Sequence, residues 1–228
     1  MAVLSFEDAR KPLVSGPSKV LTFEDSQVLA KKYRIRTPRY GIARTPVELS
    51  RVLGRYKYPV VMKLVSPDVV HKSDVGGVVM DVRSEADAHK AFEKFWTICR
   101  KRRFTFRGAL VQEQVEGTYV LVGLKRDPQF GPVVAFGLGG VFVEIMKDVT
   151  FRVCPVSDKD ADEMVKEIKG YPILAGARGS ERVDMKAIRQ AIKAVSAIGM
   201  RENVRELDLN PLVVSKKGAW AVDVRVVT

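Results

Sequence analysis

One segment of this sequence combines residue types that suit the handling of a phosphoryl group. It spans residues 69–78 and contains a histidine, a lysine, an aspartate and two adjacent glycines. The neutral imidazole of His71 is nucleophilic near neutral pH, because its ordinary pKa is about 6.5. Lys72 is placed to neutralise a transferred phosphoryl group, Asp74 to orient the ring, and Gly76-Gly77 to admit phosphate oxygens to backbone N–H groups. A surface turn uses similar residues, so this segment alone leaves both interpretations open.

A second segment, residues 206–212, carries the residue types of a metal site. Strand alternation places Glu206, Asp208 and Asn210 on one face, with leucines on the other. Downstream, Asp223 interrupts an otherwise apolar strand, where a carboxylate needs a partner. Carboxylate and amide oxygens are the ligands that Mg²⁺ prefers, so we expect a magnesium site in this hairpin. An internal hydrogen bond to Asp223 is the structural alternative.

Two strand segments could bind a nucleotide. Lys63 is the one charged residue in the apolar run of residues 60–65. It is either a phosphate-binding cation or an edge-strand lysine that points outward, and the strand alone does not separate the two. The run Gln112-Glu113-Gln114 ends a strand, where a carboxylate can recognise an adenine amino group. A solvated entry to a hairpin explains the same three residues more simply.

Two glycine-containing segments complete the candidate chemistry. Residues 137–140 form a Gly-Leu-Gly-Gly loop that lacks the spacing of a dinucleotide-binding fingerprint and of a Walker A loop. Such a loop can still admit a triphosphate, with Glu144 in reach on the strand that follows. Arg178 lies in a second Gly-rich segment and is suited to clamp a phosphate with two hydrogen bonds.

The elements that position these residues follow from capping residues and from hydrophobic periodicity. We predict helices at residues 22–33, from 46 onward, 84–99, 159–169 and 185–198. We predict strands at residues 40–44, 60–65, 77–82, 108–114, 118–125, 132–136, 142–146, 150–156, 204–209 and 220–227. The strands at 108–114 and 118–125 are expected to pair as a hairpin, as are the last two strands. Antiparallel strands mixed with separate helices indicate an α+β fold.

The composition excludes several classes of protein. The 228 residues are 46% hydrophobic, which is enough for a sizeable core, and no apolar run is long enough to span a membrane. The N-terminal residues lack the apolar stretch of a secretory signal. Cys99 and Cys154 have neither disulfide-framework nor metal-ligand spacing, so we expect reduced thiols in a cytoplasmic protein. The high content of charged residues and the scarcity of asparagine favour a thermophilic source.

The net charge of +12, from 39 Lys and Arg against 27 Asp and Glu, favours polyanionic partners such as nucleotides. The densest basic cluster is residues 100–103, with Arg107 close behind. It follows a predicted helix, where cations complement the helix dipole, and no aromatic ladder or zinc module accompanies it. We interpret it as a solvated face rather than a nucleic-acid-binding patch.

Taken together, these segments resemble the ATP-grasp subunits of ADP-forming acyl-CoA synthetases, and in particular the β subunits of the archaeal acetyl-CoA synthetases of this type. Six landmarks in order carry the resemblance, which extends from about residue 22 to residue 227. They are residues 58–63, 71–78, 125–132, 137–140, 176–179 and 207–212. The related succinyl-CoA synthetase β subunits share the lysine, the paired glycines and the Asn-Pro-Leu hairpin.

The resemblance implies an ATP-grasp fold, in which two lobes hold a nucleotide between their sheets. We expect an N-terminal arm at residues 1–21 and a first lobe at residues 22–110. The first lobe would contain the phosphohistidine loop at residues 66–78. A second lobe, residues 111–228, would carry the nucleotide and metal site.

The resemblance also implies roles for individual residues. The catalytic residues are His71, Lys63, Asp74 and Arg178. The nucleotide-binding residues are Lys63, Gln112, Glu113, Gln114, Val115, Gly139, Gly140 and Glu144. The Mg²⁺ ligands are Asn210 and Asp223, assisted by Glu206 or Asp208. Tyr119 departs from the pattern, because relatives are expected to carry a glutamate there.

The implied reaction is acyl-CoA + ADP + phosphate giving acid + CoA + ATP, and its reverse. A phosphohistidine forms on a CoA-binding α subunit, and His71 relays the phosphoryl group to ADP. The CoA-binding half is absent from this chain, so we expect a partner subunit, an α2β2 assembly, and no full reaction by this chain alone. Acyl specificity would then lie on the partner.

Three other functions compete with this hypothesis. An ATP-grasp ligase that forms an acylphosphate directly would carry no phosphohistidine on this chain. A basic nucleic-acid-binding module would bind with a steep salt dependence and without preference for Mg·ADP. A non-catalytic nucleotide sensor would keep Lys63, Asn210 and Asp223 but leave His71 unphosphorylated.

Overall fold

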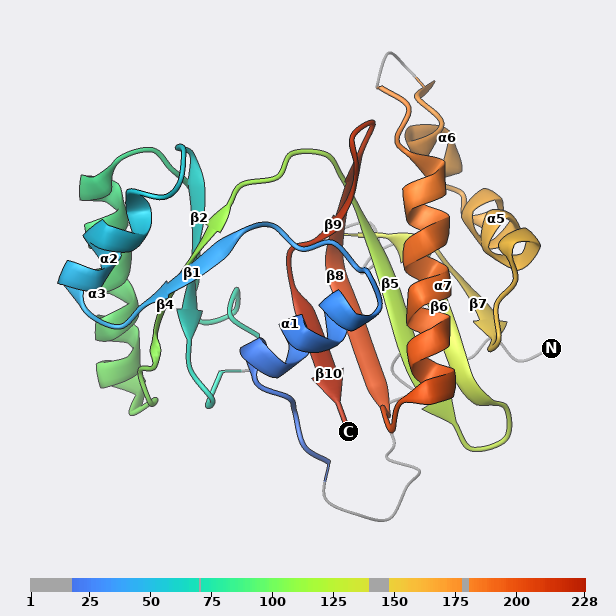
Figure 1. Cartoon of the computed structure of the whole chain (residues 1–228), viewed down its shortest axis with the longest axis horizontal. Helices are drawn as coiled ribbons and strands as arrows, with labels where there is room; N and C mark the ends of the chain where they lie inside the picture. The colour runs from blue at the N-terminus through green and yellow to red at the C-terminus, as the bar shows by residue number, and fades with distance from the viewer. Residues whose placement is uncertain (1–17, 70, 140–147, 178–180) are drawn as a thin grey trace. The chain divides into compact units, whose positions relative to one another are not determined.

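The protein is described by a computed structural model that covers residues 18–69, 71–139, 148–177 and 181–228. The chain divides into two compact units. The smaller unit is Pro38–Val115, and the larger unit comprises the described residues of Met1–Thr37 and Glu116–Thr228. Each unit is an antiparallel sheet packed against helices, so the predicted α+β class is confirmed (Figure 1).

The smaller unit contains a four-stranded sheet in the order β1-β4-β2-β3. Its strands are β1 (Tyr40–Ala43), β2 (Val60–Val65), β3 (Val78–Val82) and β4 (Gly108–Glu113). Its helices are α2 (Pro46–Leu53) and α3 (Glu85–Arg102). Both helices pack on one face of the sheet, where Met62, Leu64 and Val111 belong to a core that also contains Phe92 and Phe95.

The larger unit contains a six-stranded sheet in the order β10-β8-β5-β6-β7, with β9 also paired to β8. Its strands are β5 (Thr118–Asp127), β6 (Gly131–Leu138), β7 (Val149–Val153), β8 (Glu206–Ser215), β9 (Gly218–Ala221) and β10 (Val224–Val227). Its helices are α1 (Phe23–Lys32), α5 (Asp158–Glu167), α6 (Tyr171–Leu174) and α7 (Met185–Arg201).

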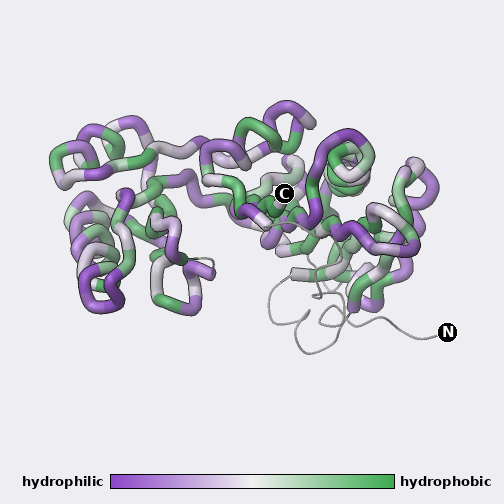
Figure 2. The backbone as a smooth tube through the Cα atoms, turned by 90° about the horizontal axis from the view of Figure 1, so that it is seen from below, coloured by the Kyte–Doolittle hydropathy of each residue, from purple (hydrophilic) through white to green (hydrophobic). Residues whose placement is uncertain are grey.

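The predicted helix starts are confirmed by their caps. The side chains of Thr22, Thr45, Ser84, Ser157 and Asp184 each accept a hydrogen bond from a backbone N–H in the first turn. These bonds satisfy N–H groups that have no partner within the helix. Along the helices, hydrophilic and hydrophobic residues alternate repeatedly, as expected for elements with one buried face (Figure 2).

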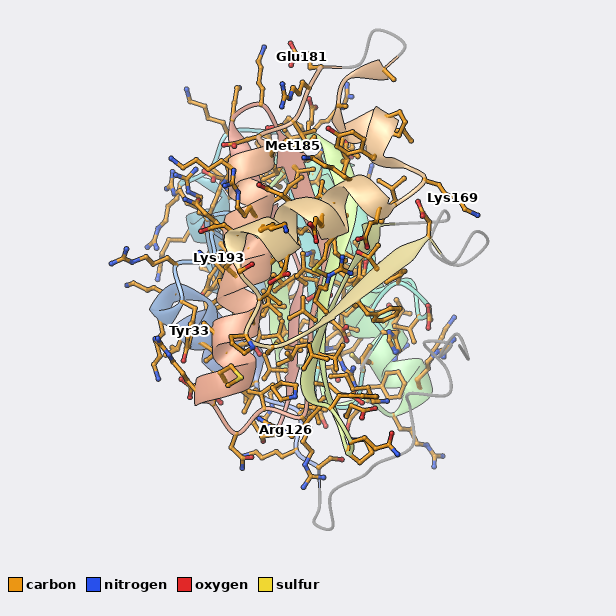
Figure 3. All side chains as sticks on the ribbon, turned by 90° about the vertical axis from the view of Figure 1, so that its right-hand side faces the viewer. Tyr33, Arg126, Lys169, Glu181, Met185 and Lys193 are labelled. Atoms are coloured by element: carbon orange, nitrogen blue, oxygen red, sulfur yellow. The ribbon has the colours of Figure 1, made fainter. Side chains whose placement is uncertain are left out.

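The core of the larger unit lies between its sheet and its helices. Helix α7 runs along the sheet and buries Ile188, Ile192, Val195 and Ile198 (Figure 3). Helix α1 is tied to the end of α7 by Tyr33, whose hydroxyl donates to the Glu202 carboxylate at 2.5 Å. The apolar face of β8 points into the same core, which leaves its polar face on the other side of the sheet.

The predicted hairpin between residues 108–114 and 118–125 is wrong. Strand β4 pairs with β1 on one side and with β2 on the other, so it has no free edge for β5. Strand β5 instead pairs with β6 and β8 in the other sheet. Gly117 begins this arrangement: its φ is 157°, and an added Cβ would lie 2.3 Å from the Val214 carbonyl oxygen. Close approach to β8 therefore requires glycine there.

The ends of the chain also differ from the prediction. Strand β8 extends to Ser215, where a turn leads into β9. The last strand, predicted at 220–227, is divided at residues 222 and 223 into β9 and β10. Within the predicted arm, the backbone N–H groups of Lys19 and Leu21 donate hydrogen bonds to the carbonyls of Thr228 and Val226. The helix predicted at 22–33 belongs to the larger unit rather than with residues 38–110. The strand predicted at 142–146 lies outside the described residues.

Candidate functional site

The segment that contains His71 connects β2 to β3 in the smaller unit. Its base is closed by backbone hydrogen bonds from Leu64 N–H to the Gly77 carbonyl, at 2.8 Å, and from Gly77 N–H to the Lys72 carbonyl, at 2.7 Å. Gly76 has a φ of 72°, a left-handed conformation that favours glycine. The paired glycines therefore hold the C-terminal end of the segment against the sheet.

The other end of the segment is fixed by Asp68. Its carboxylate accepts a hydrogen bond from the Thr105 backbone N–H at 2.6 Å. This bond, together with the Thr105 side chain and then the charge of Arg107, holds the pKa of Asp68 below its ordinary value. The residues that follow α3 thus anchor the segment at its start.

His71 is exposed between these two anchors. Within the described part of the chain, neither its imidazole nor the Asp74 carboxylate has a hydrogen-bond or ionic partner. The structure therefore does not bring Asp74 to the ring as predicted, because Asp74 lies in an exposed turn. The second histidine, His89, lies in α3, where its Nε2 atom is 3.2 Å from the Ser50 hydroxyl and 3.7 Å from the Glu85 carboxylate.

Lys63 and Gln112 lie on the sheet face opposite to the one that α2 and α3 cover. The register pairs Lys63 with Leu110, and Val61 with Gln112, so the two polar residues are diagonal neighbours on β2 and β4. Both are buried, with 7% and 1% of their surface exposed. The Gln112 Nε2 group is buried without a hydrogen-bond partner in the described structure, which is costly unless a ligand accepts from it.

The other residues predicted at this strand end have protein partners. The Glu113 carboxylate contacts the Arg39 guanidinium at 3.3 Å and the Arg39 backbone N–H at 3.3 Å. Gln114 accepts a hydrogen bond from the Asp81 backbone N–H at 2.9 Å, and Val115 follows β4. Strand alternation places Gln112, rather than Glu113, on the face that carries Lys63.

Only part of the predicted glycine loop is described. Gly139 follows β6, and its N–H donates to the Tyr119 carbonyl at 2.7 Å. An added Cβ would lie 3.0 Å from the Tyr119 carbonyl carbon, so glycine lets the two segments approach. Gly140, Glu144 and Arg178 lie outside the described residues.

The C-terminal hairpin brings Asn210 and Asp223 together. Leu209 pairs with Val224, and Leu212 with Ala221, in one continuous register. Asn210 therefore lies opposite Asp223, in the two-residue interruption that separates β9 from β10. Asn210 is exposed and Asp223 is half-buried, rather than enclosed in an apolar strand as the sequence suggested.

Glu206 and Asp208 share a guanidinium that the sequence analysis missed. Arg225 Nη1 lies 3.7 Å from Glu206 Oε2 and 3.4 Å from Asp208 Oδ2. All three residues lie on the face that carries Asn210 and Asp223. Among the described residues, no group of three His, Cys, Asp or Glu side chains is arranged to hold a metal ion. A cation two residues after Asp223 was the available sequence signal.

Two other predictions from the sequence concern membrane insertion and surface charge. No helix in the described ranges combines the length and the apolar content that crossing a bilayer requires. The basic cluster at residues 100–103 forms the last turn of α3 and its cap, and the Arg100 guanidinium lies over the exposed Trp96 ring at 5.1 Å. The cluster is thus part of a helix rather than a segment that follows one.

The comparisons with known proteins bear directly on these arrangements. A model of the ATP-grasp domain matches residues 13–228. The chain is 41% identical over 214 residues to the ADP-forming acetate–CoA ligase I subunit beta of Pyrococcus furiosus, with 92% of each chain covered.

Two solved structures of acetyl-coenzyme A synthetase 1 from Candidatus Korarchaeum cryptofilum are also similar. One, with coenzyme A, acetyl-coenzyme A and a phosphorylated phosphohistidine segment, matches at 40% identity and a TM-score of 0.81. The other, with coenzyme A and Mg-AMPPCP, has its phosphohistidine segment pointing towards the nucleotide-binding site and matches at 39% identity and a TM-score of 0.77. Each match covers 91% of this chain and 92% of the other.

Proposed function

Because the chain belongs to the ATP-grasp family, among the β subunits of the ADP-forming acetate–CoA ligases, we propose that it is the nucleotide-binding subunit of such an enzyme. This membership confirms the resemblance inferred from the sequence. The complete enzyme interconverts acyl-CoA, ADP and phosphate with acid, CoA and ATP. This subunit transfers the phosphoryl group between a phosphohistidine of its partner and ADP.

The transfer takes place in two steps that both use His71. In the first, an imidazole nitrogen of His71 attacks the phosphorus of the partner's phosphohistidine, so one N–P bond forms as the other breaks. In the second, a terminal phosphate oxygen of ADP attacks the same phosphorus, and the bond to His71 breaks to leave ATP. Such reactions depend mainly on positioning and on charge neutralisation, which suits an exposed histidine between two anchored ends.

The nucleotide site is proposed to include the face of the smaller sheet that α2 and α3 do not cover. Lys63 supplies a cation for the phosphates there, and the unpaired Gln112 Nε2 group supplies a donor for the base or ribose. Arg178, Gly140 and Glu144 remain proposed contributors from outside the described residues. Glu113 stays a proposed contact of the base, and both its carboxylate and its backbone N–H contact Arg39 in the nucleotide-free chain.

Magnesium is proposed to bind at Asn210 and Asp223. The two residues fit, because the register places an amide on β8 opposite a carboxylate in the break between β9 and β10. Mg²⁺ typically takes one or two protein carboxylates together with substrate phosphates, so a small ligand set is sufficient. When bound, the metal would neutralise phosphate charge. Asp223 and Asn210 hold their oxygens in place for it.

The partner is proposed to be a CoA-binding α subunit that carries its own phosphohistidine, in an α2β2 assembly in the cytoplasm. The acyl group is selected on that partner. A phosphorylated His71 has no role in the three alternative functions, which are a direct acylphosphate ligase, a nucleotide sensor and a nucleic-acid-binding module.

The observation that carries this proposal is the exposed His71 in a chain whose solved relatives have a phosphohistidine segment. The test is to incubate the full chain with ATP labelled at the γ-phosphate and Mg²⁺, and to measure acid-labile, base-stable phosphate on the protein. We expect labelling of the wild type, chase of the label into ATP by added ADP, and loss of labelling in His71→Asn.

His89→Asn is the matched control, because it removes the only other histidine and should keep the label. A wild-type chain that binds Mg·ADP but acquires no acid-labile phosphate would instead support the direct ligase or the nucleotide sensor. Equal labelling of His71→Asn would exclude His71 as the carrier.

A further inference from the structure

We propose that Asp68 is a positioning residue that fixes the backbone of His71 at one place in the smaller unit, so that His71 acts as a stationary relay between the partner and ADP. This inference rests on the proposed function, in which His71 carries the phosphoryl group. Asp68 has no assigned contact with the phosphorus, the nucleotide or the metal. It acts only through the chain that it shares with His71.

The carboxylate of Asp68 joins the histidine segment to a distant part of the sequence. It accepts a hydrogen bond from the Thr105 backbone N–H at 2.6 Å, and the Asp68 N–H donates to the Ser66 hydroxyl at 3.2 Å. The bond from the Thr105 backbone holds the pKa of Asp68 below its ordinary value, so the carboxylate is ionised at neutral pH. Hydrogen bonds to an ionised acceptor are about twice as strong as bonds between neutral groups.

The donor in this contact is itself held in place. On one side of Thr105, the Phe104 N–H donates to the Cys99 carbonyl at 2.9 Å and closes the end of α3. On the other side, the Arg107 N–H donates to the Val65 carbonyl at 2.9 Å, at the end of β2. The connection that contains Thr105 is therefore tied to both a helix and the sheet, and it offers Asp68 a fixed donor.

His71 lies close to fixed residues on both sides. Val69 directly follows Asp68 and belongs to the core of the smaller unit, with 9% of its surface exposed. Two residues of chain span at most about 7 Å, which limits the distance between the Cα atoms of Val69 and His71. On the other side, the Lys72 carbonyl accepts from the Gly77 N–H at 2.7 Å. The backbone of His71 therefore stays beside these residues for as long as the contacts last.

A stationary His71 makes the rate of transfer depend on Asp68. The partner's phosphohistidine and ADP must both approach the same point, and each transfer needs the imidazole in line with the phosphorus. A displacement of about 1 Å can lower such a rate by about 100-fold. Without the Asp68 carboxylate, one of the contacts that hold the start of the segment is lost, and the imidazole is placed less well for both steps.

The test compares the full-length Asp68→Ala and Asp68→Asn proteins with the wild type in three measurements. Labelling of His71 by Mg·ATP labelled at the γ-phosphate should slow by about tenfold to 100-fold in Asp68→Ala. Asp68→Asn should be intermediate, because its amide oxygen accepts a weaker bond. The Kd for Mg·ADP should stay within about twofold of the wild-type value, since Asp68 provides no binding contact. Amide hydrogen exchange in residues 71–77 should become at least about tenfold faster in Asp68→Ala.

Asp160→Ala is the matched control for loss of a carboxylate that binds a backbone N–H. Asp160 accepts from the Ser157 N–H at 2.9 Å, and bonds from the Ser157 side chain and backbone hold its pKa below its ordinary value. It caps α5 in the larger unit, so its loss should change neither the labelling nor the exchange of the histidine segment. Thr105→Ala keeps the backbone donor and should slow labelling by no more than about threefold.

Three results would overturn the proposal. A folded Asp68→Ala protein could label at the wild-type rate, or residues 71–77 could exchange at the wild-type rate. The Kd for Mg·ADP could also rise as much as labelling slows, which would make Asp68 a nucleotide ligand. Hydrogen exchange separates this inference from the proposed function. If the wild type acquires no label, the proposed function fails, whereas exchange still decides whether Asp68 fixes the segment.

Discussion

The two sheets carry their polar residues in different ways on the face that their own helices leave uncovered. In the smaller unit, this face carries a lysine and a glutamine that are almost fully buried, with Tyr40 paired to Gln112 on β1. In the larger unit this face carries carboxylates, an amide, an arginine and a lysine, Lys125, and most of these side chains are partly exposed. The first face offers buried donors, and the second offers acidic groups with cationic neighbours.

Under the proposed function, this difference suits the two units to separate tasks. Donors and a cation suit phosphate and base recognition, whereas hard oxygen ligands suit a divalent metal. The histidine segment belongs to the donor-rich unit, which avoids repulsion between a phosphoryl group and a row of carboxylates. The following experiments test the contrast, in order of decreasing effect.

The largest effect is expected from the hairpin that is proposed to bind magnesium at Asn210 and Asp223. Asp223→Asn removes the carboxylate opposite Asn210, and we expect kcat/KM for Mg·ADP in the enzyme assembled with its partner subunit to fall by roughly 100-fold or more. Higher Mg²⁺ concentration should restore part of the activity. Glu206→Gln is the comparison within the same face and should cost only a few-fold, because Glu206 faces Arg225. Equal losses in both variants would mean that the carboxylates act as one ligand set.

A smaller effect is expected at Gln112. Gln112→Leu removes the buried unpaired Nε2 group, so the free energy of unfolding should stay within about 1 kcal/mol of the wild type or increase. The same change should weaken ADP binding about tenfold, because the nucleotide loses a buried donor. Calorimetric titration and thermal unfolding measure both quantities. Gln190→Leu, on the exposed side of α7, is the control, and a large loss of stability in Gln112→Leu would indicate a structural role.

The smallest effect is expected away from either candidate site, at Glu202. Hydrogen bonds from Lys32 and then Tyr33 hold the pKa of Glu202 below its ordinary value of 4.5. The carboxylate therefore stabilises the fold at neutral pH, and this contribution disappears as the pH falls through the lowered pKa. Glu202→Gln should lower Tm by about 2 to 4 °C at pH 7, for a loss of up to about 1 kcal/mol.

The difference in Tm between wild type and Glu202→Gln should shrink as the pH falls through the lowered pKa of Glu202. Glu93→Gln, an exposed change on α3, serves as the control with no pH-dependent difference. A difference in Tm that is constant between pH 7 and pH 3 would show that packing, rather than charge, links α1 to α7.

Much of the local structure was predictable because it depends on neighbours in sequence. Thr22, Ser84 and Asp184 cap helices where the sequence placed them, and alternation on β8 put Glu206, Asp208 and Asn210 on one face. The pairing of β4 with β5 was not predictable from the short connection between them. Whether two consecutive strands form a hairpin depends on which edges are already occupied by strands from elsewhere in the chain.

The sequence by itself determined the family, the helix starts, the histidine that precedes the paired glycines, and the hairpin with its amide and carboxylates. Only the tertiary structure decided that Gln112 rather than Glu113 shares a face with Lys63, and that Arg39 holds Glu113. It also decided that Arg225 joins Glu206 to Asp208 and that Asn210 lies opposite Asp223. The physical reason is that periodicity selects the face of a strand, whereas strand order and register select the partners that a side chain meets there.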